Sequence, residues 1–163
     1  MNIHYAKEID LPAIIEIYNA AIAGRLATAD LNPISVESRL DWFQSHSSVK
    51  YPIWVIDYQG KIAGWLSLQE FNPRPAFHKT AEISIYIAPA WQFKGLGKEL
   101  LRNAIAQCPN LGIYTILGFI FGHNQPSLKL FTSFGFEQWG CMPQIAELDG
   151  IERDVIVLGK RIR

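Results

Sequence analysis

The residues best suited to chemistry in this chain lie where an apolar stretch runs into a loop that contains glycine. Residues 83–101 read ISIYIAPAWQFKGLGKELL, so that Gly95 and Gly97 stand between Lys94 and Lys98 at the start of an amphipathic segment. Glycine lets the backbone approach a ligand closely and adopt positive φ. The first N–H groups of a helix lack partners and favour a negative charge in front of them. The loop is therefore predicted to bind a phosphate or pyrophosphate group.

The spacing of this loop distinguishes it from two other phosphate-binding motifs. It lacks the G-x-x-x-x-G-K-[ST] pattern of a P-loop. It also lacks G-x-G-x-x-G, because position 100 is Leu, and this disfavours dinucleotide binding of the Rossmann type. A glycine-containing loop that merely starts an ordinary helix stays open as the alternative.

The elements that must position this loop follow from hydrophobic periodicity and turn residues. Strands are predicted at Ile3–Ala6, Tyr51–Tyr58, Lys61–Glu70, Thr80–Ile87, Gly112–Phe121, Phe136–Met142 and Val155–Leu158. Helices are predicted at Leu11–Ile22, Val36–Phe43, Leu96–Ala106 and Ser127–Phe134, with Asp10 and Ser35 as N-caps of the first two. A hairpin-linked antiparallel block followed by β-α-β units predicts an α/β (mixed α+β) fold, with a mixed sheet and helices on both faces.

The whole chain, residues 1–163, is predicted to form one domain, because no repeat, linker or low-complexity segment interrupts it. Since 15 basic residues balance 15 acidic ones, nucleic acid is not expected as a partner. No apolar run approaches the roughly 20 residues of a membrane-spanning helix, and the first residues do not resemble a secretory signal. We therefore expect a cytoplasmic protein that does not bind membranes.

The cysteines and histidines do not indicate a metal centre. Cys108 and Cys141 are predicted to be free thiols, as in a reducing compartment, and they do not form a C-x-x-C motif. The histidines at positions 4, 46, 78 and 123 have no mutual spacing typical of metal ligands. No metal is predicted.

The loop Q-x-x-G-x-G-K, with an Asn about 27 residues after it, resembles the acetyl-CoA loop of the GNAT superfamily of N-acyltransferases. Residues 71–87 are similar to the F-x-x-R … Y-R-H-T-V-E-x-S-V-Y-V signature of phosphinothricin/methionine sulfone acetyltransferases. Residues 124–136 are similar to that group's N-x-x-S-[IL] … GF segment. Glu16–Asn19, Arg39 and Trp42-Phe43 also match, so the resemblance extends over nearly the whole chain.

This resemblance implies a splayed sheet that binds acetyl-CoA as the acetyl donor. The backbone around Ile85, Tyr86 and Ile87 would hold the pantetheine arm, with the N–H near Ile87 facing the thioester oxygen. The pyrophosphate would lie on Phe93, Lys94, Gly95, Leu96, Gly97 and Lys98, and further cofactor contacts would come from Asn124 and Ser127. For Asn124, a plain helix cap before Pro126 remains the alternative.

The resemblance also implies residues for the acceptor amine. Glu82 is the only carboxylate between Glu70 and Glu99, and the matching Glu of the family acts as a general base. The alternative is an exposed Glu82, or one paired with Lys79. Substrate contacts are expected from Glu82 and from the loop Arg74, Pro75, Ala76 and Phe77, although Arg74 beside two prolines could equally be an ordinary surface residue.

Two departures from the family pattern bear on the chemistry. Phe131 stands where many members have a Tyr or His that acts as an acid, and Phe cannot donate a proton. Residues 146–148 (Ala-Glu-Leu) replace Gly-x-Lys, and Ile151-Glu152 replaces Arg-Trp. Because a cation and an aromatic have become an anion and an aliphatic, we expect a neutral or cationic amine rather than a dianionic phosphinothricin-like acceptor.

These observations predict an acetyl-CoA-dependent N-acetyltransferase that moves an acetyl group directly to a small primary amine, such as an amino acid or its analogue. Cofactor and amine would approach from opposite sides of the splay. The alternatives are an N-terminal acetyltransferase of proteins or peptides, and a CoA-binding regulatory domain without turnover. A homodimer is expected if Trp139, Met142 and Ile145 form an interface; as terminal-strand residues they could equally be core.

Overall fold

The computed structural model describes all residues from 1 to 163. The strands are β1 (Asn2–Tyr5), β2 (Ile53–Tyr58), β3 (Lys61–Glu70), β4 (Thr80–Ile87), β5 (Thr115–Phe121), β6 (Glu137–Leu148) and β7 (Ile151–Arg161). The helices are α1 (Leu11–Ala23), α2 (Leu40–Gln44), α3 (Leu96–Gln107) and α4 (Gln125–Ser133). Short 3-10 turns lie at Glu8–Asp10, Glu37–Arg39, Pro75–Phe77, Pro89–Trp91 and Cys108–Leu111.

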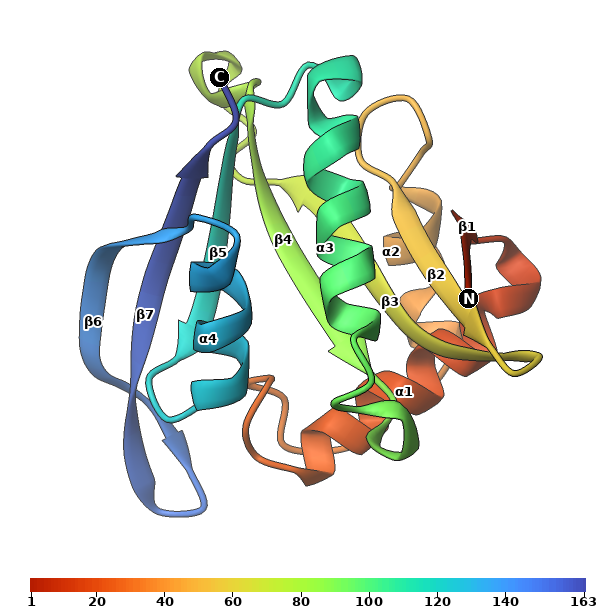
Figure 1. Cartoon of the computed structure of the whole chain (residues 1–163). Coiled ribbons are helices and arrows are strands. Elements are labelled where there is room, and N and C mark those ends of the chain that lie inside the picture. Colours follow the sequence, from red (N-terminus) through yellow and green to blue (C-terminus); the bar gives the residue numbers. More distant parts are fainter.

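All seven strands form one mixed sheet in the order β1-β2-β3-β4-β5-β7-β6, and only β4 and β5 are parallel neighbours. Helices α3 and α4 cover one face of this sheet, and α1 and α2 cover the other (Figure 1). The larger core joins the apolar side of α3, including Leu100 and Leu101, to the sheet. The smaller core packs α1 residues such as Ile14 against Val55 and Trp65. This is the predicted architecture.

The centre of the sheet opens between β4 and β5. The two strands pair only over Thr80–Glu82 and Thr115–Leu117. Beyond these residues β4 stays paired with β3 as far as Ile87, and β5 stays paired with β7 as far as Phe121. Because each strand is held by its outer neighbour, the two halves of the sheet diverge toward the carboxyl ends of β4 and β5 (Figure 1).

The two closing strands are longer than the sequence patterns predict. The predicted strand ends at Met142, but β6 continues through Pro143 to Leu148, because β6 is an edge strand and an edge tolerates a residue without an N–H. The register shifts between Met142 and Ala146, where Gln144 has φ +53° and donates its N–H to Asp154 Oδ1 at 2.8 Å. A tight turn at Asp149-Gly150, both with positive φ, then leads into β7.

Two predicted helix caps differ in the structure. Asp10 is the N-cap residue of α1, as predicted, but its side chain makes no capping hydrogen bond to that helix; its carboxylate instead accepts the Lys7 N–H at 2.8 Å in the preceding 3-10 turn. Ser35 Oγ does accept the Ser38 N–H at 3.2 Å, but the turn it begins is a 3-10 turn, and α2 starts only at Leu40. Both differences lie at element ends, where a side chain of the same type serves either kind of turn.

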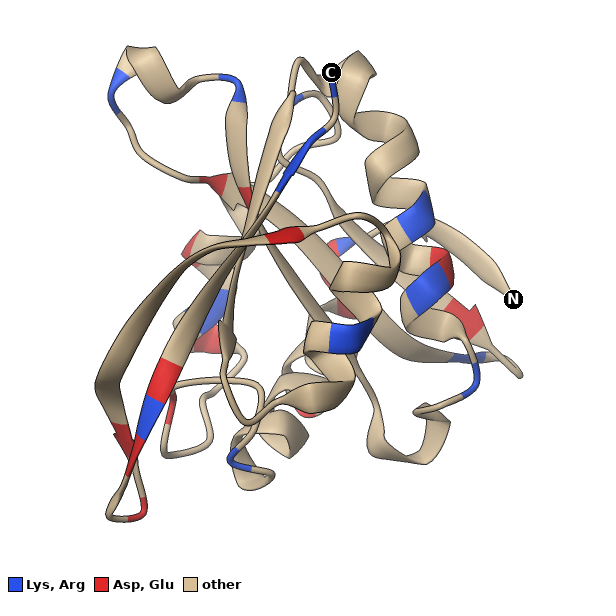
Figure 2. Ribbon diagram, turned by 60° about the vertical axis from the view of Figure 1, so that its left-hand side comes forward, with Lys and Arg blue, Asp and Glu red and all other residues tan.

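None of the helices is long and apolar enough to cross a membrane. Lys, Arg, Asp and Glu are spread over the surface, and acidic residues gather at the tip of the β6–β7 hairpin (Figure 2). The acidic residues beside that turn are Glu147, Asp149 and Glu152.

Candidate active site

The diverging edge of β4 presents unpaired backbone groups. Ala88 donates its N–H to the Ala63 carbonyl at 2.8 Å, and the register of β3 and β4 is continuous from there. Hydrogen bonds to one neighbour alternate along an antiparallel pair, so Ile87 and Ile85 direct their N–H and C=O groups away from β3. Both lie beyond the last pair with β5. This edge can therefore accept an extended chain that carries amides, as an added strand.

Tyr86 lies between these two residues but faces the other way. Its backbone pairs with Trp65 of β3, and its side chain lies on the α1 side of the sheet. The Tyr86 hydroxyl donates to the Ala27 carbonyl at 3.4 Å, and burial raises the pKa of this phenol above its usual range. Of the three predicted pantetheine residues, Tyr86 thus presents its side chain, not its backbone, to the site.

The loop before α3 has the shape expected of an anion-binding turn. Phe93 has φ +62° and is 89% exposed, and Gly95, at φ +84°, is the N-cap of α3. Leu96 is buried and fixes the helix start to the core. Lys94 and Lys98 lie at the surface, and neither pairs with a carboxylate. The first N–H groups of α3 and two uncompensated cations therefore meet at one place.

Gly97 has a packing role in addition to the ligand-binding role predicted for it. A Cβ at this position would lie 3.2 Å from Leu130 Cδ2, and about 4 Å from side-chain atoms of Ile85 and Ile87. These atoms belong to α4 and β4, so the small residue is needed for close packing of α3. The space for a Cβ at Gly97 is thus filled by the protein and not by a ligand, while the backbone of Gly97 stays a predicted contact of the pyrophosphate.

Asn124 caps α4, as the alternative interpretation held. It is 7% exposed, and its Oδ1 accepts the Ser127 N–H at 3.3 Å. Its amide nitrogen donates to no group of the chain, so the cap leaves a donor available at the end of β5. Asn124 and Ser127 thus stand across the opening of the sheet from β4.

Glu82 lies where the splay begins. It pairs with Gln69 of β3 and with Leu117 of β5, is partly buried, and forms no ion pair. Lys79, the alternative partner, instead places its Nζ 5.5 Å from the centroid of the Tyr114 ring. The neighbours Ala81 and Ile83 face the α3 core, so Glu82 faces the α1 side.

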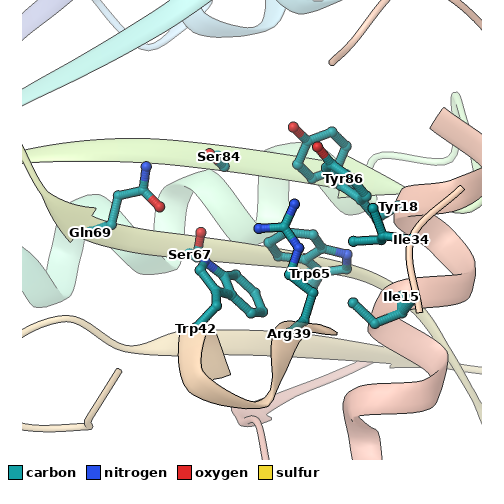
Figure 3. A pocket seen from close by; sticks show the side chains of 10 residues that line it. All are labelled: Ile15, Tyr18, Ile34, Arg39, Trp42, Trp65, Ser67, Gln69, Ser84 and Tyr86. Atoms are coloured by element: carbon teal, nitrogen blue, oxygen red, sulfur yellow. The ribbon is translucent and has the colours of Figure 1, made fainter. Parts of the chain in front are cut away.

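A cavity of about 180 Å³ lies on this same face (Figure 3). Its floor is formed by the cross-strand pairs Trp65–Tyr86 and Ser67–Ser84, which are followed by the pair Gln69–Glu82. Its walls are the helix-side residues Ile15, Tyr18, Ile34, Arg39 and Trp42. Glu82 therefore belongs to the next residue pair on the face of β3 and β4 that forms the cavity floor.

Polar contacts hold the far wall of the cavity in place. Asp30 accepts hydrogen bonds from Tyr18 Oη and, at 3.4 Å, from the guanidinium of Arg39. Tyr18 also shares a hydrogen bond of 2.6 Å with Thr28, and Arg39 lies over its ring at 5.7 Å from the centroid. Burial and the hydrogen bond to Asp30 raise the pKa of Tyr18. The charge of Arg39 is thus partly balanced by Asp30.

The predicted substrate loop lies outside this cavity. Arg74 precedes the 3-10 turn Pro75–Phe77, and Arg74, Pro75, Ala76 and Phe77 are all exposed. Phe77 packs edge-on against Phe71 at 5.6 Å between centroids. The turn connects β3 to β4, so it stands beyond the Gln69–Glu82 end of the cavity floor.

Phe131 belongs to the core. It is 2% exposed and packs edge-on against Phe136, with 5.0 Å between the ring centroids. Its ring lies in the cluster formed by α3, α4 and the sheet, on the side opposite the cavity. The side chain thus has a packing role and supplies no proton.

The altered C-terminal segment forms the tip of the β6–β7 hairpin. Glu147 pairs with Glu152 across the two strands, and Asp149 forms an ion pair of 3.0 Å with Arg25 from the loop after α1. Trp139 and Ile145 are 45% and 58% exposed, so neither is part of the core of a single chain. The hairpin therefore combines an acidic tip with exposed apolar residues.

Sequence patterns missed most of the cavity residues. Ser67 and Ser84 each lie two residues from an aromatic residue, so a serine and an aromatic residue share one face of β3 and of β4. This pattern was a usable sign that this face is not ordinary core. The contribution of Arg39 and Trp42 depends on how α2 packs on the sheet, and no local pattern predicts that.

Comparisons with known proteins agree with this geometry. A model of the acetyltransferase (GNAT) family matches residues 13–136. YwnH of Bacillus subtilis strain 168, provisionally named a phosphinothricin acetyltransferase, is 47% identical over 163 residues, which cover 99% of both chains. The L-methionine sulfoximine/L-methionine sulfone acetyltransferase of Salmonella typhimurium is 32% identical over 145 residues, 89% of this chain and 85% of that protein.

A solved structure shows the same fold in a complex. The phosphinothricin acetyltransferase of Sinorhizobium meliloti, bound to acetyl-CoA, superposes with a TM-score of 0.92 at 28% identity, covering 98% of this chain and 87% of that one. The chain belongs to the GNAT acetyltransferase family. The resemblance to its phosphinothricin and methionine sulfone acetyltransferases is thereby confirmed, as are the predicted fold and enzyme class.

Proposed function

We propose that this protein transfers the acetyl group of acetyl-CoA to the amino group of an amino acid or amino-acid analogue. The observation that carries this proposal is the position of Glu82. It stands at the point where the sheet opens, with the unpaired edge of Ile85 and Ile87 further along the same strand and the cavity floor on its own face. Cofactor and amine therefore have separate approaches that converge near one carboxylate.

The residues of the opening fit the donor. The edge at Ile85 and Ile87 matches the amides of the pantetheine arm, and the loop from Phe93 to Lys98 supplies N–H groups and two cations for the pyrophosphate. Asn124 adds a free amide donor from the other side. Acetyl-CoA supplies an acetyl group activated as a thioester, and these contacts would hold it in the splay.

Glu82 would act as the general base. An ammonium group must lose a proton before it attacks a carbonyl carbon, and the Glu82 carboxylate would accept that proton directly or through a water molecule. The N–H of Ile87 would donate a hydrogen bond to the oxygen on which negative charge develops. The departing thiolate would take its proton from solvent, since Phe131 is buried on the far face.

Transfer would proceed without an acyl-enzyme intermediate. Cys108 is buried, and burial raises the pKa of its thiol to about 12, so the thiolate that would carry an acyl group is scarce at neutral pH. Cys141 is exposed on the edge strand β6, away from the opening between β4 and β5.

The names of the relatives point to the acceptor class. They act, by name, on L-amino acids, phosphinothricin, and methionine sulfoximine or sulfone. Within this class we favour acceptors whose side chain is neutral or cationic, because Glu147 and the pair Ile151-Glu152 replace a cation and an aromatic residue of the family pattern with anions and an aliphatic residue. The cavity also has walls on its helix side, which suits a small molecule better than a peptide chain.

We infer in addition a cytoplasmic homodimer. The exposed residues Trp139, Ile145 and Ile151 lie on the two terminal strands, and an edge strand with apolar side chains is a natural surface for a second copy. The free thiols of Cys108 and Cys141 accord with a reducing compartment such as the cytoplasm.

A thiol-release assay with acetyl-CoA and a panel of amines tests the proposal. We expect turnover with free amino acids or their sulfone and sulfoximine analogues. Release of CoA only with peptides would favour an N-terminal acetyltransferase. Tight CoA binding with no turnover on any amine would favour a regulatory domain, and would overturn the proposed activity.

A further inference from the structure

Ser67 carries a buried hydroxyl that has no partner. It lies in the middle of β3 and is 1% exposed, and its Oγ has essentially no accessible surface and no hydrogen bond. The other buried polar residues, Thr28 and Asn124, are both hydrogen-bonded, to Tyr18 and to the Ser127 N–H. A buried hydroxyl without a partner is costly, so its place in the middle of a strand needs a reason.

The surroundings of Ser67 supply one, because the hydroxyl lines the cavity described above (Figure 3). Ser84 stands opposite it on β4, and Gln69 follows it on the same face of β3. The guanidinium of Arg39 reaches in from the helix side, already engaged with Asp30 at 3.4 Å. Hydroxyls, a carboxamide and a guanidinium all offer hydrogen-bond donors, so the space fits a group rich in acceptor oxygens.

The balance of charge and the apolar walls define that group further. Asp30 offsets the charge of Arg39, and the flanking side chains Trp42 and Trp65 are aromatic. A polar group on a short apolar stem matches this lining better than a second full negative charge does. Ser67 lies two residues, about 7 Å along the strand, from Gln69, the residue that pairs with Glu82. This distance suits the end of a side chain whose amino group lies near Glu82.

We propose that Ser67 is a specificity-determining residue whose hydroxyl donates a hydrogen bond to an oxygen of the acceptor. This inference rests on the proposed function, since it takes the cavity as the acceptor site. The oxygen belongs to an uncharged group of the acceptor's side chain, as in a sulfone; the acceptor's carboxylate, the other source of such an oxygen, is distinguished by the experiment below.

The test compares Ser67→Ala with the wild type on L-methionine sulfone and on L-methionine, which lacks the sulfonyl oxygens. We expect kcat/KM for the sulfone to fall about tenfold, the loss of one hydrogen bond, while methionine changes less than twofold. The melting temperature should stay constant or rise by about 2–4 °C, because an unsatisfied hydroxyl has been removed. Thr28→Val, which removes a buried hydroxyl that is bonded to Tyr18, is the control and should lower it.

The remaining outcomes each decide a point. An equal loss on both acceptors, abolished with the corresponding amines that lack the carboxylate, assigns the carboxylate as the oxygen. No loss on either acceptor, or a lower melting temperature with unchanged selectivity, overturns the proposal.

Binding is measured separately from turnover, through quenching of tryptophan fluorescence by methionine sulfone, since Trp42 and Trp65 line the cavity. If methionine sulfone binds about tenfold more weakly to Ser67→Ala but the wild type transfers no acetyl group, the role of Ser67 in binding is supported and the enzymatic function is refuted. Turnover that is normal in Ser67→Ala would support the enzymatic function and refute the role of Ser67. Absence of any binding or transfer with methionine sulfone overturns the role of Ser67.

Discussion

Glu82 and Leu117 form the last pair of residues that β4 and β5 share before the two strands separate. Every rung beyond them on β4 has a partner on β3 only. The carboxylate therefore marks the inner end of the opening, where an amine from the cavity and a thioester from the splay would meet. This relationship, more than any single contact, makes the position of Glu82 suitable for proton transfer.

Replacing Glu82 with Gln tests this role. We expect kcat/KM to fall by roughly 10²–10⁴-fold and the acidic limb of its pH profile to disappear, because the amide cannot accept the proton. CoA affinity and the melting temperature should be retained, since Gln is nearly isosteric and Glu82 forms no ion pair. Glu70→Gln, at the exposed end of β3, is the matched control and should behave as wild type. A Glu82→Gln enzyme with the wild-type rate and profile would refute the assignment.

Substitutions of Gly95, the N-cap of α3, and of Gly97, in its first turn, should act for different physical reasons. Gly95 has φ +84° and open space where a Cβ would stand, so Gly95→Ala strains the turn by about 1–2 kcal/mol and should weaken CoA binding, measured by calorimetry. Gly60→Ala is the control: Gly60 has φ +78° in the β2–β3 turn, equally uncrowded, so the variant should lose similar stability but keep CoA affinity. Equal CoA affinity in both variants would contradict the loop assignment.

Gly97→Ala should act through packing. Its Cβ would lie 3.2 Å from Leu130, so α3 must move against α4, or Leu130 must shift. We expect a change in melting temperature that the double variant Gly97→Ala/Leu130→Ala partly reverses, because the truncated side chain makes room. Independent, additive effects of the two substitutions would show that the close contact is unimportant.

Stability should fall on acidification because of His46. Burial lowers the pKa of this imidazole, whose Nδ1–H donates to the Trp42 carbonyl at 2.7 Å while the buried Nε2 has no partner. The unfolded chain therefore binds the proton more readily, and the free energy of unfolding decreases as the pH falls through about 6.5. Urea unfolding of the wild type and of His46→Gln at pH 7.5 and 5.5 measures this. His78→Gln, at an exposed turn, should keep the wild-type difference, and a His46→Gln protein that also keeps it would contradict the prediction.

The proposed dimer is tested by one charge on the hairpin. Ile145 is 58% exposed on β6, so Ile145→Glu should yield a monomer in sedimentation experiments with an unchanged circular dichroism spectrum. Ile9→Glu, at a residue that is 84% exposed near the other edge of the sheet, should remain a dimer. A wild-type protein that sediments as a monomer would refute the dimer.

The fold and the anion-binding loop were accessible from local sequence because each depends on short-range patterns, whereas the pantetheine edge at Ile85 and Ile87 was implied only by the family resemblance. Runs of β-branched and aromatic residues between turn signals located the seven strands, and the glycine loop located the start of α3. The full length of the hairpin was not accessible in this way, because Pro143 is typical of a strand end and conceals the turn signal at Asp149-Gly150 further on. Both features make sense only once β6 is known to be an edge.

The acceptor cavity was inaccessible because distant segments build it. Arg39, Ser67 and Ser84 come from three elements, and only the packing of α2 against β3 and β4 brings them together. The loop Arg74–Phe77, inferred from the family resemblance, stays exposed outside the cavity and remains a prediction. Local chemistry predicted the pyrophosphate loop, whereas the acceptor cavity is defined by tertiary packing.

The short seam between β4 and β5 has a mechanical consequence. Only three rungs connect the four-stranded half of the sheet, β1 to β4, with the three-stranded half formed by β5, β7 and β6. A molecule that hydrogen-bonds to Ile85 and Ile87 and also contacts Asn124 would connect the two halves of the sheet for as long as it is bound. Because such a ligand binds only the folded chain, the protein should melt at higher temperature as acetyl-CoA is added. The substrate would then complete the sheet on which it reacts, and each round of release would restore the gap.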